Sequence, residues 1–209
     1  MSTVAQKWAL ISVYNKNRIL EFAQALVDLG WSILASGGTA KVLTEAGIKV
    51  RDVADLVGSG AILGHRVVTL SRELHAGLLA DPLNSEHVAE MEALGLPIID
   101  MVVCDFYPLR EAIAKEGATI QSVVEQTDIG GPTMVRSAAK GGRIVICRPE
   151  DRGWVLGQLQ RHGDVLPAGR QELRARAEFE VAKYVMDSAS YHSGGLLNDI
   201  FYNKIDIVA

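Results

Sequence analysis

Short apolar runs alternate with amphipathic segments along the first half of this chain. The runs with the length of a buried strand cover residues 8–13, 31–35 and 48–53. The segments whose apolar positions recur at helical spacing cover residues 18–29 and 40–46, and a glycine follows each of them. This alternation predicts an α/β fold whose strands run parallel and are joined by crossover helices.

The second half continues the alternation after a less regular stretch at residues 56–73, which we interpret as loop around one short element. Further strands are predicted at residues 98–104 and 144–147, and further helices at residues 85–94, 120–125, 133–140, 149–159 and 172–198. In the last helix, we expect a buried face made of Ala175, Phe179, Ala182, Val185 and Met186. Because no linker or repeat divides the chain, residues 1–209 are predicted to form a single domain, with a mostly parallel central sheet flanked by helices in three layers.

Composition and charge restrict the possible classes of function. Apolar residues make up 48% of the chain and charged residues 22%, which is ordinary for a globular protein. The net charge of -4 argues against a polynucleotide as the main partner, because nucleic-acid-binding domains carry a basic surplus. Residues 1–7 lack an apolar signal core, and no apolar run approaches the length of a membrane span. We therefore expect a cytoplasmic protein that binds a small molecule, with no polynucleotide and no membrane as partner.

The side chains that commonly bind metals are scattered along the chain. Cys104 and Cys147 each lie in an apolar run, which indicates buried free thiols. No two of the five histidines have the spacing of metal ligands, so we expect no metal.

A glycine-rich turn follows the strand predicted at residues 31–35. Its hydroxyl and glycine residues are Ser36, Gly37, Gly38 and Thr39. Two glycines let the backbone approach an anion, and the following helix offers free N–H groups and the positive end of its dipole. Ser12 and Lys16 follow the first strand and are expected at the same edge of the sheet, where ligands bind. A phosphate site and an ordinary turn capped by Thr39 both remain open.

A second glycine pair, Gly130 and Gly131, precedes the helix predicted at residues 133–140. Asp128 stands just before this pair, and Lys140 lies near the end of the helix. A carboxylate and a lysine that share a dry pocket can shuttle protons, because each affects the ionisation of the other. The alternative is a capping carboxylate followed by a solvated basic helix face.

Two polar side chains, Asp105 and Tyr107, directly follow the strand predicted at residues 98–104. A phenol at the carboxyl end of a strand can donate a hydrogen bond to a developing oxyanion. A half-buried tyrosine that packs against Pro108 is an equal alternative.

Taken together, these segments resemble the inosine monophosphate cyclohydrolase domain, the N-terminal half of a bifunctional purine-biosynthesis protein. The matching segments are residues 9–16, 35–40, 66–70, 75–77, 107–108 and 128–140. The last of these, Asp-Ile-Gly-Gly-Pro-Thr-Met-Val-Arg-Ser-Ala-Ala-Lys, is the longest and most specific. The resemblance extends over residues 8–203, which we take as the core of the domain.

This resemblance implies a methylglyoxal-synthase-like fold without a metal or organic cofactor. The implied reaction closes the pyrimidine ring of 5-formamidoimidazole-4-carboxamide ribonucleotide and loses water to give the purine ribonucleotide inosine monophosphate. The residues implied to hold the 5′-phosphate are Ser12, Lys16, Ser36, Gly37, Gly38 and Thr39. Those implied to surround the base are Arg66, Thr69, Asp105, Ile129 and Gly130. Those implied to transfer protons and to stabilise the tetrahedral intermediate are Lys140, Asp128 and Tyr107.

The chain departs from the family pattern at positions expected in the pocket. Where the family reads Arg-Val-Lys-Thr-Leu-His-Pro, residues 66–72 read Arg-Val-Val-Thr-Leu-Ser-Arg. Val68 thus replaces a lysine implied to take part in the chemistry, and valine neither donates a proton nor carries charge. Asp105 replaces an asparagine, so a carboxylate that only accepts hydrogen bonds when ionised stands in place of a neutral amide.

Three functions remain open from the sequence. The first is a stand-alone cyclohydrolase that works beside a separate formyltransferase. The second is a divergent paralogue that acts on another imidazole or purine-like ribonucleotide in specialised metabolism, and the third is a catalytically silent nucleotide-binding protein. Asp128, Lys140 and Tyr107 favour an enzyme, whereas Val68 and Asp105 favour a changed substrate. We also expect a homodimer.

Overall fold

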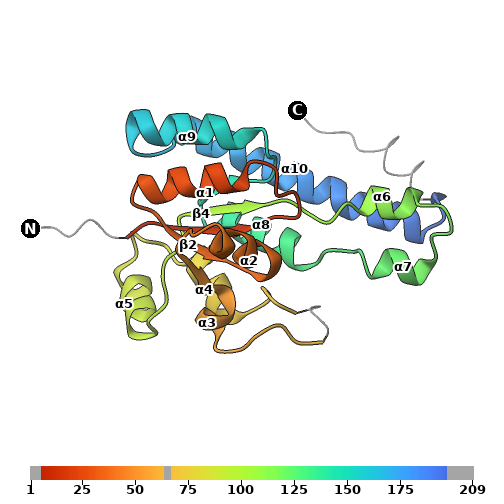
Figure 1. Ribbon diagram of the computed structural model, residues 1–209, viewed down its shortest axis with the longest axis horizontal. Coiled ribbons are helices and arrows are strands. Elements are labelled where there is room, and N and C mark those ends of the chain that lie inside the picture. Colours follow the sequence, from red (N-terminus) through yellow and green to blue (C-terminus); the bar gives the residue numbers. More distant parts are fainter. Residues whose placement is uncertain (1–5, 64–66, 197–209) are drawn as a thin grey trace, which may run out of the picture.

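A computed structural model of the chain describes residues 6–63 and 67–196. Within these residues, five strands form one sheet in the order β3-β2-β1-β4-β5, and every neighbouring pair is parallel (Figure 1). The strands are β1 (Trp8–Ser12), β2 (Ser32–Ala35), β3 (Val50–Asp52), β4 (Met101–Cys104) and β5 (Ile144–Ile146). This arrangement confirms the predicted α/β class and parallel sheet.

The sheet is buried on both faces, as expected for parallel strands covered by helices. Successive residues of the central strand β1 point to opposite faces, so Ala9 and Ile11 belong to one apolar cluster and Leu10 to the other. In register, Leu10 lies beside Leu34 of β2 and Val102 of β4.

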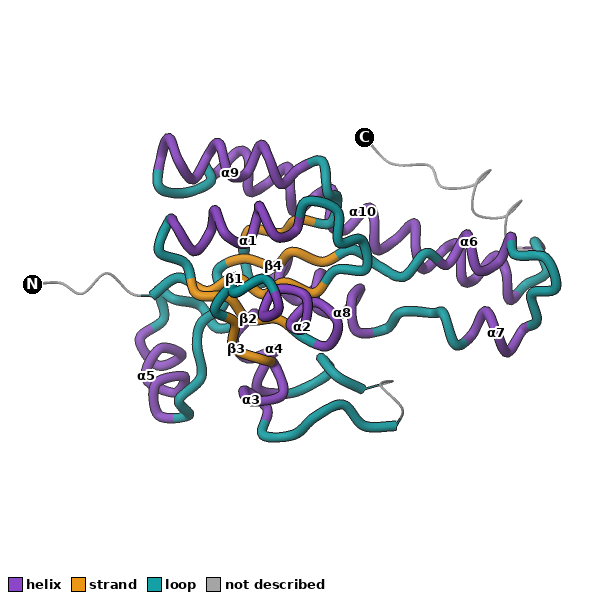
Figure 2. Tube along the Cα trace, in the orientation of Figure 1, coloured by secondary structure: helices purple, strands orange, loops and turns teal. Residues whose placement is uncertain are grey.

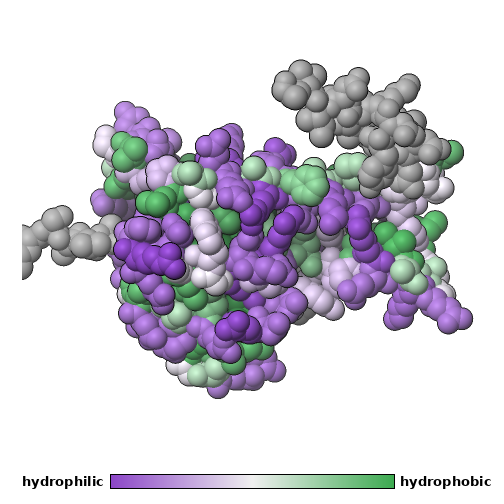
Figure 3. All heavy atoms as spheres, turned by 90° about the horizontal axis from the view of Figure 1, so that it is seen from above, coloured by the Kyte–Doolittle hydropathy of each residue, from purple (hydrophilic) through white to green (hydrophobic). Residues whose placement is uncertain are grey.

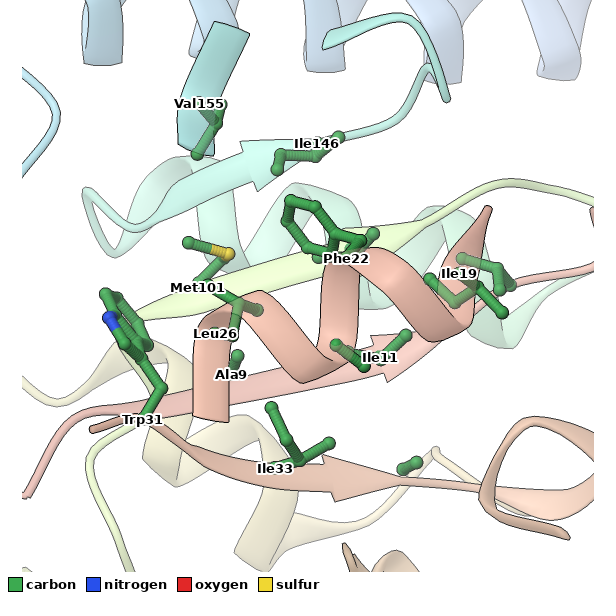
Figure 4. Packing of buried hydrophobic residues seen from close by; sticks show 14 of the residues in the cluster. Ala9, Ile11, Ile19, Phe22, Leu26, Trp31, Ile33, Met101, Ile146 and Val155 are labelled. Carbon is green, nitrogen blue, oxygen red and sulfur yellow. The ribbon is translucent and has the colours of Figure 1, made fainter. Parts of the chain in front are cut away.

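Helices cover each face and complete the three predicted layers (Figures 1 and 2). The helices that contribute buried residues to the face of Ala9 and Ile11 include α1 (Ile19–Asp28), α2 (Gly37–Glu45) and α9 (Asp151–His162). Those on the face of Leu10 include α3 (Val53–Val57), α4 (Arg72–Leu79), α8 (Gly130–Lys140) and α10 (Pro167–His192). Figure 4 shows the first face, where Phe22 and Leu26 of α1 pack over Ile11 and Met101.

The remaining helices lie at the periphery. They are α5 (Ser85–Ala93), α6 (Leu109–Ala114) and α7 (Ile120–Val124). Leu109 of α6 and Val123 of α7 form a small apolar cluster with Tyr184 of α10. The backbone between β4 and α8 is thereby fixed against α10, and this segment carries much of the candidate site.

Two helices begin at glycines that the sequence analysis assigned to turns. α2 begins at Gly37 instead of residue 40, and α8 begins at Gly130 instead of residue 133. In each case the glycine pair forms the first helical turn, so its backbone N–H groups belong to the helix N-terminus. α4 was not predicted: it begins at the end of the stretch expected to be irregular, where the Ser71 side chain caps it by accepting a hydrogen bond from the Leu74 N–H at 3.1 Å.

The predicted buried face of α10 is wrong. The buried residues of this helix are Leu173, Ala177, Val181 and Tyr184. Phe179 is 61% exposed and Val185 is 54% exposed, although both were expected in the core. The helix carries two apolar stripes, and periodicity alone does not decide which one meets the sheet.

Polar side chains dominate one face of the molecule (Figure 3). The face seen in Figure 3 carries mostly hydrophilic residues, with hydrophobic ones in small groups. Among the helices of the described residues, none is long and apolar enough to cross a membrane.

Candidate active site

A cavity of about 710 Å³ opens at the carboxyl ends of the strands. The chain segments that meet there include the loops after β1, β2 and β4, residues 68–70 before α4, residues 124–129 after α7 and the first turn of α8. Twelve predicted site residues line this main cavity: Ser12, Lys16, Ser36, Gly37, Gly38, Thr39, Thr69, Asp105, Tyr107, Asp128, Ile129 and Gly130. Val68, which replaces the family's lysine, lines it as well. The size and location match the usual place of ligand sites in open parallel sheets.

Two predicted site residues are not among them. Arg66 lies outside the described residues. Lys140 lines a second cavity of about 600 Å³ beside α8 and α10, which shares Asp128 and Ile129 with the main cavity. Lys140 ends α8, ten residues after Gly130, so the helical rise separates their backbones by about 15 Å. Its predicted role in proton transfer remains a prediction.

The α2 end of the main cavity has the features of an anion site. Ser36 is the extended N-cap residue of α2, but its side chain makes no capping hydrogen bond; its Oγ lies 3.2 Å from the Oγ of Ser12. Gly37 has φ +51°, a left-handed conformation that glycine adopts without strain. The first N–H groups of the helix have no acceptor within it, and the helix dipole makes this end positive. Two hydroxyls and free backbone donors therefore face the same end of the cavity.

Because Ser36 is the N-cap residue of α2, Thr39 is not its cap, and Thr39 instead binds the backbone of Val13. Its buried hydroxyl donates to the carbonyl of Val13 at 3.1 Å and accepts from the Val13 N–H at 3.2 Å. Both bonds fix the β1–α1 loop, residues 13–18, to helix α2. Thr39 thus positions the loop that carries Lys16.

Lys16 lies close to the backbone of its own loop. Its Nζ donates to the carbonyl of Val13 and, at 3.4 Å, to that of Tyr14. Burial lowers the pKa of Lys16, the nearby Asp105 raises it in part, and Arg152 lowers it further. The Lys16 ammonium, near the N-terminus of α2, has few anionic partners, so this position favours an anionic ligand.

Asp105 reaches back from β4 to the β1–α1 loop. Its carboxylate accepts the backbone N–H of Tyr14 and, at 3.2 Å, that of Asn15. Burial raises the pKa of Asp105, and these hydrogen bonds and the charges of Arg152 and Lys16 partly offset that rise. Although Asp105 lines the cavity, much of its acceptor capacity is used by the loop.

Arg152, which no sequence motif indicates, approaches Asp105 from the first turn of α9. The side chain of Arg152 is 6% exposed, and its Nη2 lies 3.8 Å from Asp105 Oδ2. The available signal was the replacement of the family's asparagine by Asp105, because a buried carboxylate requires a positive partner.

Asp128 is held at the N-terminus of α8. Its Oδ1 accepts the Gly131 N–H at 2.9 Å, and its own N–H donates to Tyr184 Oη at 2.8 Å. Burial raises the pKa of Asp128, although hydrogen bonds from the backbone of Gly131, Tyr107 and Gly130 oppose this. A carboxyl group with a raised pKa in a cavity is a candidate acid or base.

A side chain at either position that follows Ile129 would have to displace a neighbouring side chain of the cavity. A Cβ on Gly130 would lie 2.5 Å from Thr69 Oγ1, and one on Gly131 would lie 2.5 Å from Asp128 Oδ2. The glycine pair therefore lets α8 begin directly against the carboxylate.

Tyr107 brings a phenol to the same side of the cavity as Asp128. Burial raises the pKa of Tyr107, and the charge of Asp128 raises it further. The ring stacks edge to face against Tyr14, with 5.9 Å between centroids. A neutral phenol near a partly buried carboxyl group can donate a hydrogen bond to an oxyanion.

Comparisons with known proteins agree with this architecture. The family model described as MGS-like domain matches residues 18–133. The bifunctional purine biosynthesis protein PurH of Caldicellulosiruptor bescii is 42% identical over 194 residues, which cover 92% of this chain and 36% of that protein. PurH of Bacillus cytotoxicus is 38% identical over 211 residues, which cover 97% of this chain and 41% of that protein.

This chain thus spans less than half the length of these curated relatives. A solved structure, the crystal structure of ForH, superposes with a TM-score of 0.81 at 31% identity and covers 91% of this chain and 99% of that chain. The chain belongs to the MGS-like domain family and is homologous to the N-terminal region of PurH.

Proposed function

We propose that this chain is a cyclohydrolase that closes the pyrimidine ring of 5-formamidoimidazole-4-carboxamide ribonucleotide to give inosine monophosphate and water. The observation that carries this proposal is the main cavity, which combines a helix N-terminus and Lys16 with the Asp128 and Tyr107 pair. A ribonucleotide has a phosphate for the first set and a reacting base for the second. Homology to PurH supports a role in purine biosynthesis.

In this proposal, the phosphate binds at the N-terminus of α2. The backbone N–H groups of Gly37 and Gly38, the hydroxyls of Ser12 and Ser36, and the ammonium of Lys16 would surround its oxygens. These donors come from two neighbouring strand ends, those of β1 and β2.

The chemistry requires two proton transfers that the Asp128 side of the cavity can serve. The carboxamide nitrogen attacks the formyl carbon, forms the new C–N bond and loses a proton to the Asp128 carboxylate. Tyr107 donates a hydrogen bond to the formyl oxygen as negative charge develops on it. The oxygen then gains two protons in all and leaves as water, while the formamide nitrogen loses its proton and a C=N bond forms. A carboxyl group whose pKa burial has raised suits both taking and returning the proton.

The experiment that tests this proposal is direct turnover. Purified protein is incubated with the formamido ribonucleotide, and formation of inosine monophosphate is followed by chromatography. Turnover that is lost in the Asp128→Asn variant supports the proposal. Measurable nucleotide binding without turnover contradicts it and favours a changed substrate. A Lys140→Ala variant, measured in parallel, decides whether Lys140 acts from the second cavity.

Lys16→Ala is expected to weaken binding of inosine monophosphate about tenfold or more, because it removes a charge-assisted contact to the phosphate. Inosine without a phosphate should bind the variant and the parent protein equally. Isothermal titration with both ligands measures this difference. An equal loss of affinity for inosine and inosine monophosphate would contradict the assignment of the phosphate site to the Lys16 end of the cavity.

A second function is favoured by one specific feature, the neutral Val68 in the cavity lining. A divergent paralogue that acts on another imidazole or purine-like ribonucleotide would not need the family's lysine. We expect Val68→Lys to raise the rate of inosine monophosphate formation about tenfold, because it restores a proton donor. Val68→Met, which adds length without charge, is the matched control. No gain in the lysine variant would support the divergent paralogue.

A further inference from the structure

Arg152 is a buried cation that no part of the proposed reaction uses. It lies in the first turn of α9, directly after β5, and its side chain is 6% exposed. Burial lowers its pKa, which reflects the penalty for removing a guanidinium from water. A buried charge is retained only where partners compensate for the lost hydration, so its contacts identify what it holds.

The contacts of Arg152 converge on the β1–α1 loop. Its Nη1 donates to the carbonyl of Asn17 at 2.8 Å, and its Nη2 faces the Asp105 carboxylate at 3.8 Å. Among the described residues, its Nε–H is buried and has no hydrogen-bond partner. The guanidinium is thus held by one backbone carbonyl and one carboxylate.

Asp105 extends this contact to the other end of the same loop, because it accepts the N–H groups of Tyr14 and Asn15. Hydrogen bonds therefore hold the loop at two places: at residues 14–15 to Asp105, and at Asn17 to Arg152 itself. Lys16 lies between these two points. Thr39 fixes the start of the loop at Val13 from the opposite side.

We propose that Arg152 is a positioning residue which, as one charge pair with Asp105, holds the β1–α1 loop so that Lys16 faces the phosphate of the ligand. This inference rests on the proposed function for the identity of the ligand. It also accounts for Asp105 in place of the family's asparagine: in this chain the carboxylate and the arginine balance each other's charge. Either one alone would leave an uncompensated charge at the base of the loop.

A rescue experiment, in which a second substitution is added to the first, tests the pairing. Arg152→Met removes the cation and leaves Asp105 buried, whereas Arg152→Met combined with Asp105→Asn leaves a neutral amide that still accepts from the loop. We expect the Tyr14 and Asn15 amides to exchange hydrogen about tenfold faster in Arg152→Met, and affinity for inosine monophosphate to fall by a similar factor. The double variant should recover most of both losses. Arg161→Met, an exposed arginine on the same helix, is the matched control and should change neither.

The outcomes separate this inference from the proposed function. Hydrogen exchange and thermal unfolding need no ligand, so they test the pairing even where inosine monophosphate does not bind the parent protein. That failure of binding would overturn the proposed function alone. If Arg152→Met does not fold, the double variant decides the question. A double variant that folds and has parental exchange rates supports the proposed pairing of Arg152 with Asp105. A double variant that also does not fold overturns the pairing. The pairing would also be overturned if Arg152→Met had the same exchange rates and affinity as Arg161→Met. The same holds if the double variant recovered neither quantity relative to Arg152→Met.

Discussion

Asp128→Asn is expected to lower turnover by about two to four orders of magnitude, while affinity for inosine monophosphate changes by less than about threefold. The asparagine has the same shape, and its amide oxygen can still accept the Gly131 N–H that Asp128 Oδ1 accepts at 2.9 Å. It cannot, however, take the proton from the attacking carboxamide nitrogen. Steady-state kinetics and titration of the product measure the two effects separately. An equal loss of affinity and rate would assign Asp128 to binding alone.

The pH dependence gives a second test of the same residue. Burial raises the pKa of Asp128, and the base must be ionised, so the acid limb of kcat/KM should lie at a higher pH than for an ordinary carboxyl group. The remaining activity of Asp128→Asn should lack this limb.

Ionisation of Asp128 should raise kcat/KM but lower the stability of the fold. Because the folded-state pKa of Asp128 is raised, its contribution to the free energy of unfolding is fully present below the unfolded pKa and is lost as pH rises through the folded pKa. The asparagine variant should therefore gain stability relative to the parent as pH rises through that range. Urea unfolding at a series of pH values measures this difference, and a constant difference would contradict an ionisable, buried Asp128.

Sequence patterns predicted those elements whose apolar residues can be buried in only one way. All five strands were predicted, because short runs buried on both sides by crossover helices can form little else. The buried face of α10 was not predicted, because two stripes compete and only packing against α8 and β5 selects between them. α4 was missed because it is short and its start depends on a cap by Ser71.

The candidate site likewise contains some features that the sequence predicted and others that it did not. Residues in turns at strand ends, such as Ser36 and Asp105, were predicted because topology alone brings such turns to one edge. Roles that depend on side-chain direction were not predictable from position. Thr39 binds the backbone of Val13, and Arg152 reaches Asp105 from a helix that shows no motif. Such contacts join segments far apart in the chain, and only the packed structure defines them.

The contact between α4 and α8 gives the largest expected effect on stability. Gly141→Ala is expected to lower the free energy of unfolding by about 3 kcal/mol or more. A Cβ at this position would lie 1.9 Å from the carbonyl oxygen of Leu78, which is backbone and cannot rotate away. The oxygen is also held by the buried Arg143, whose Nε donates to it at 2.9 Å. Relief of the clash therefore requires α4 and α8 to separate and that hydrogen bond to break.

Backbone conformation does not account for this effect, because Gly141 has φ −74° and ψ 0°, which alanine adopts without strain. Gly157→Ala in α9 is the matched control: its Cβ would meet only the end of the Arg161 side chain, at 4.0 Å. Alanine there should stabilise the helix by about 0.5–1 kcal/mol. Urea unfolding of both variants measures the contrast. A Gly141→Ala protein as stable as the parent would mean that α4 and α8 can separate freely, and the N-terminus of α8 would then not be held rigidly enough to fix Asp128 in the cavity.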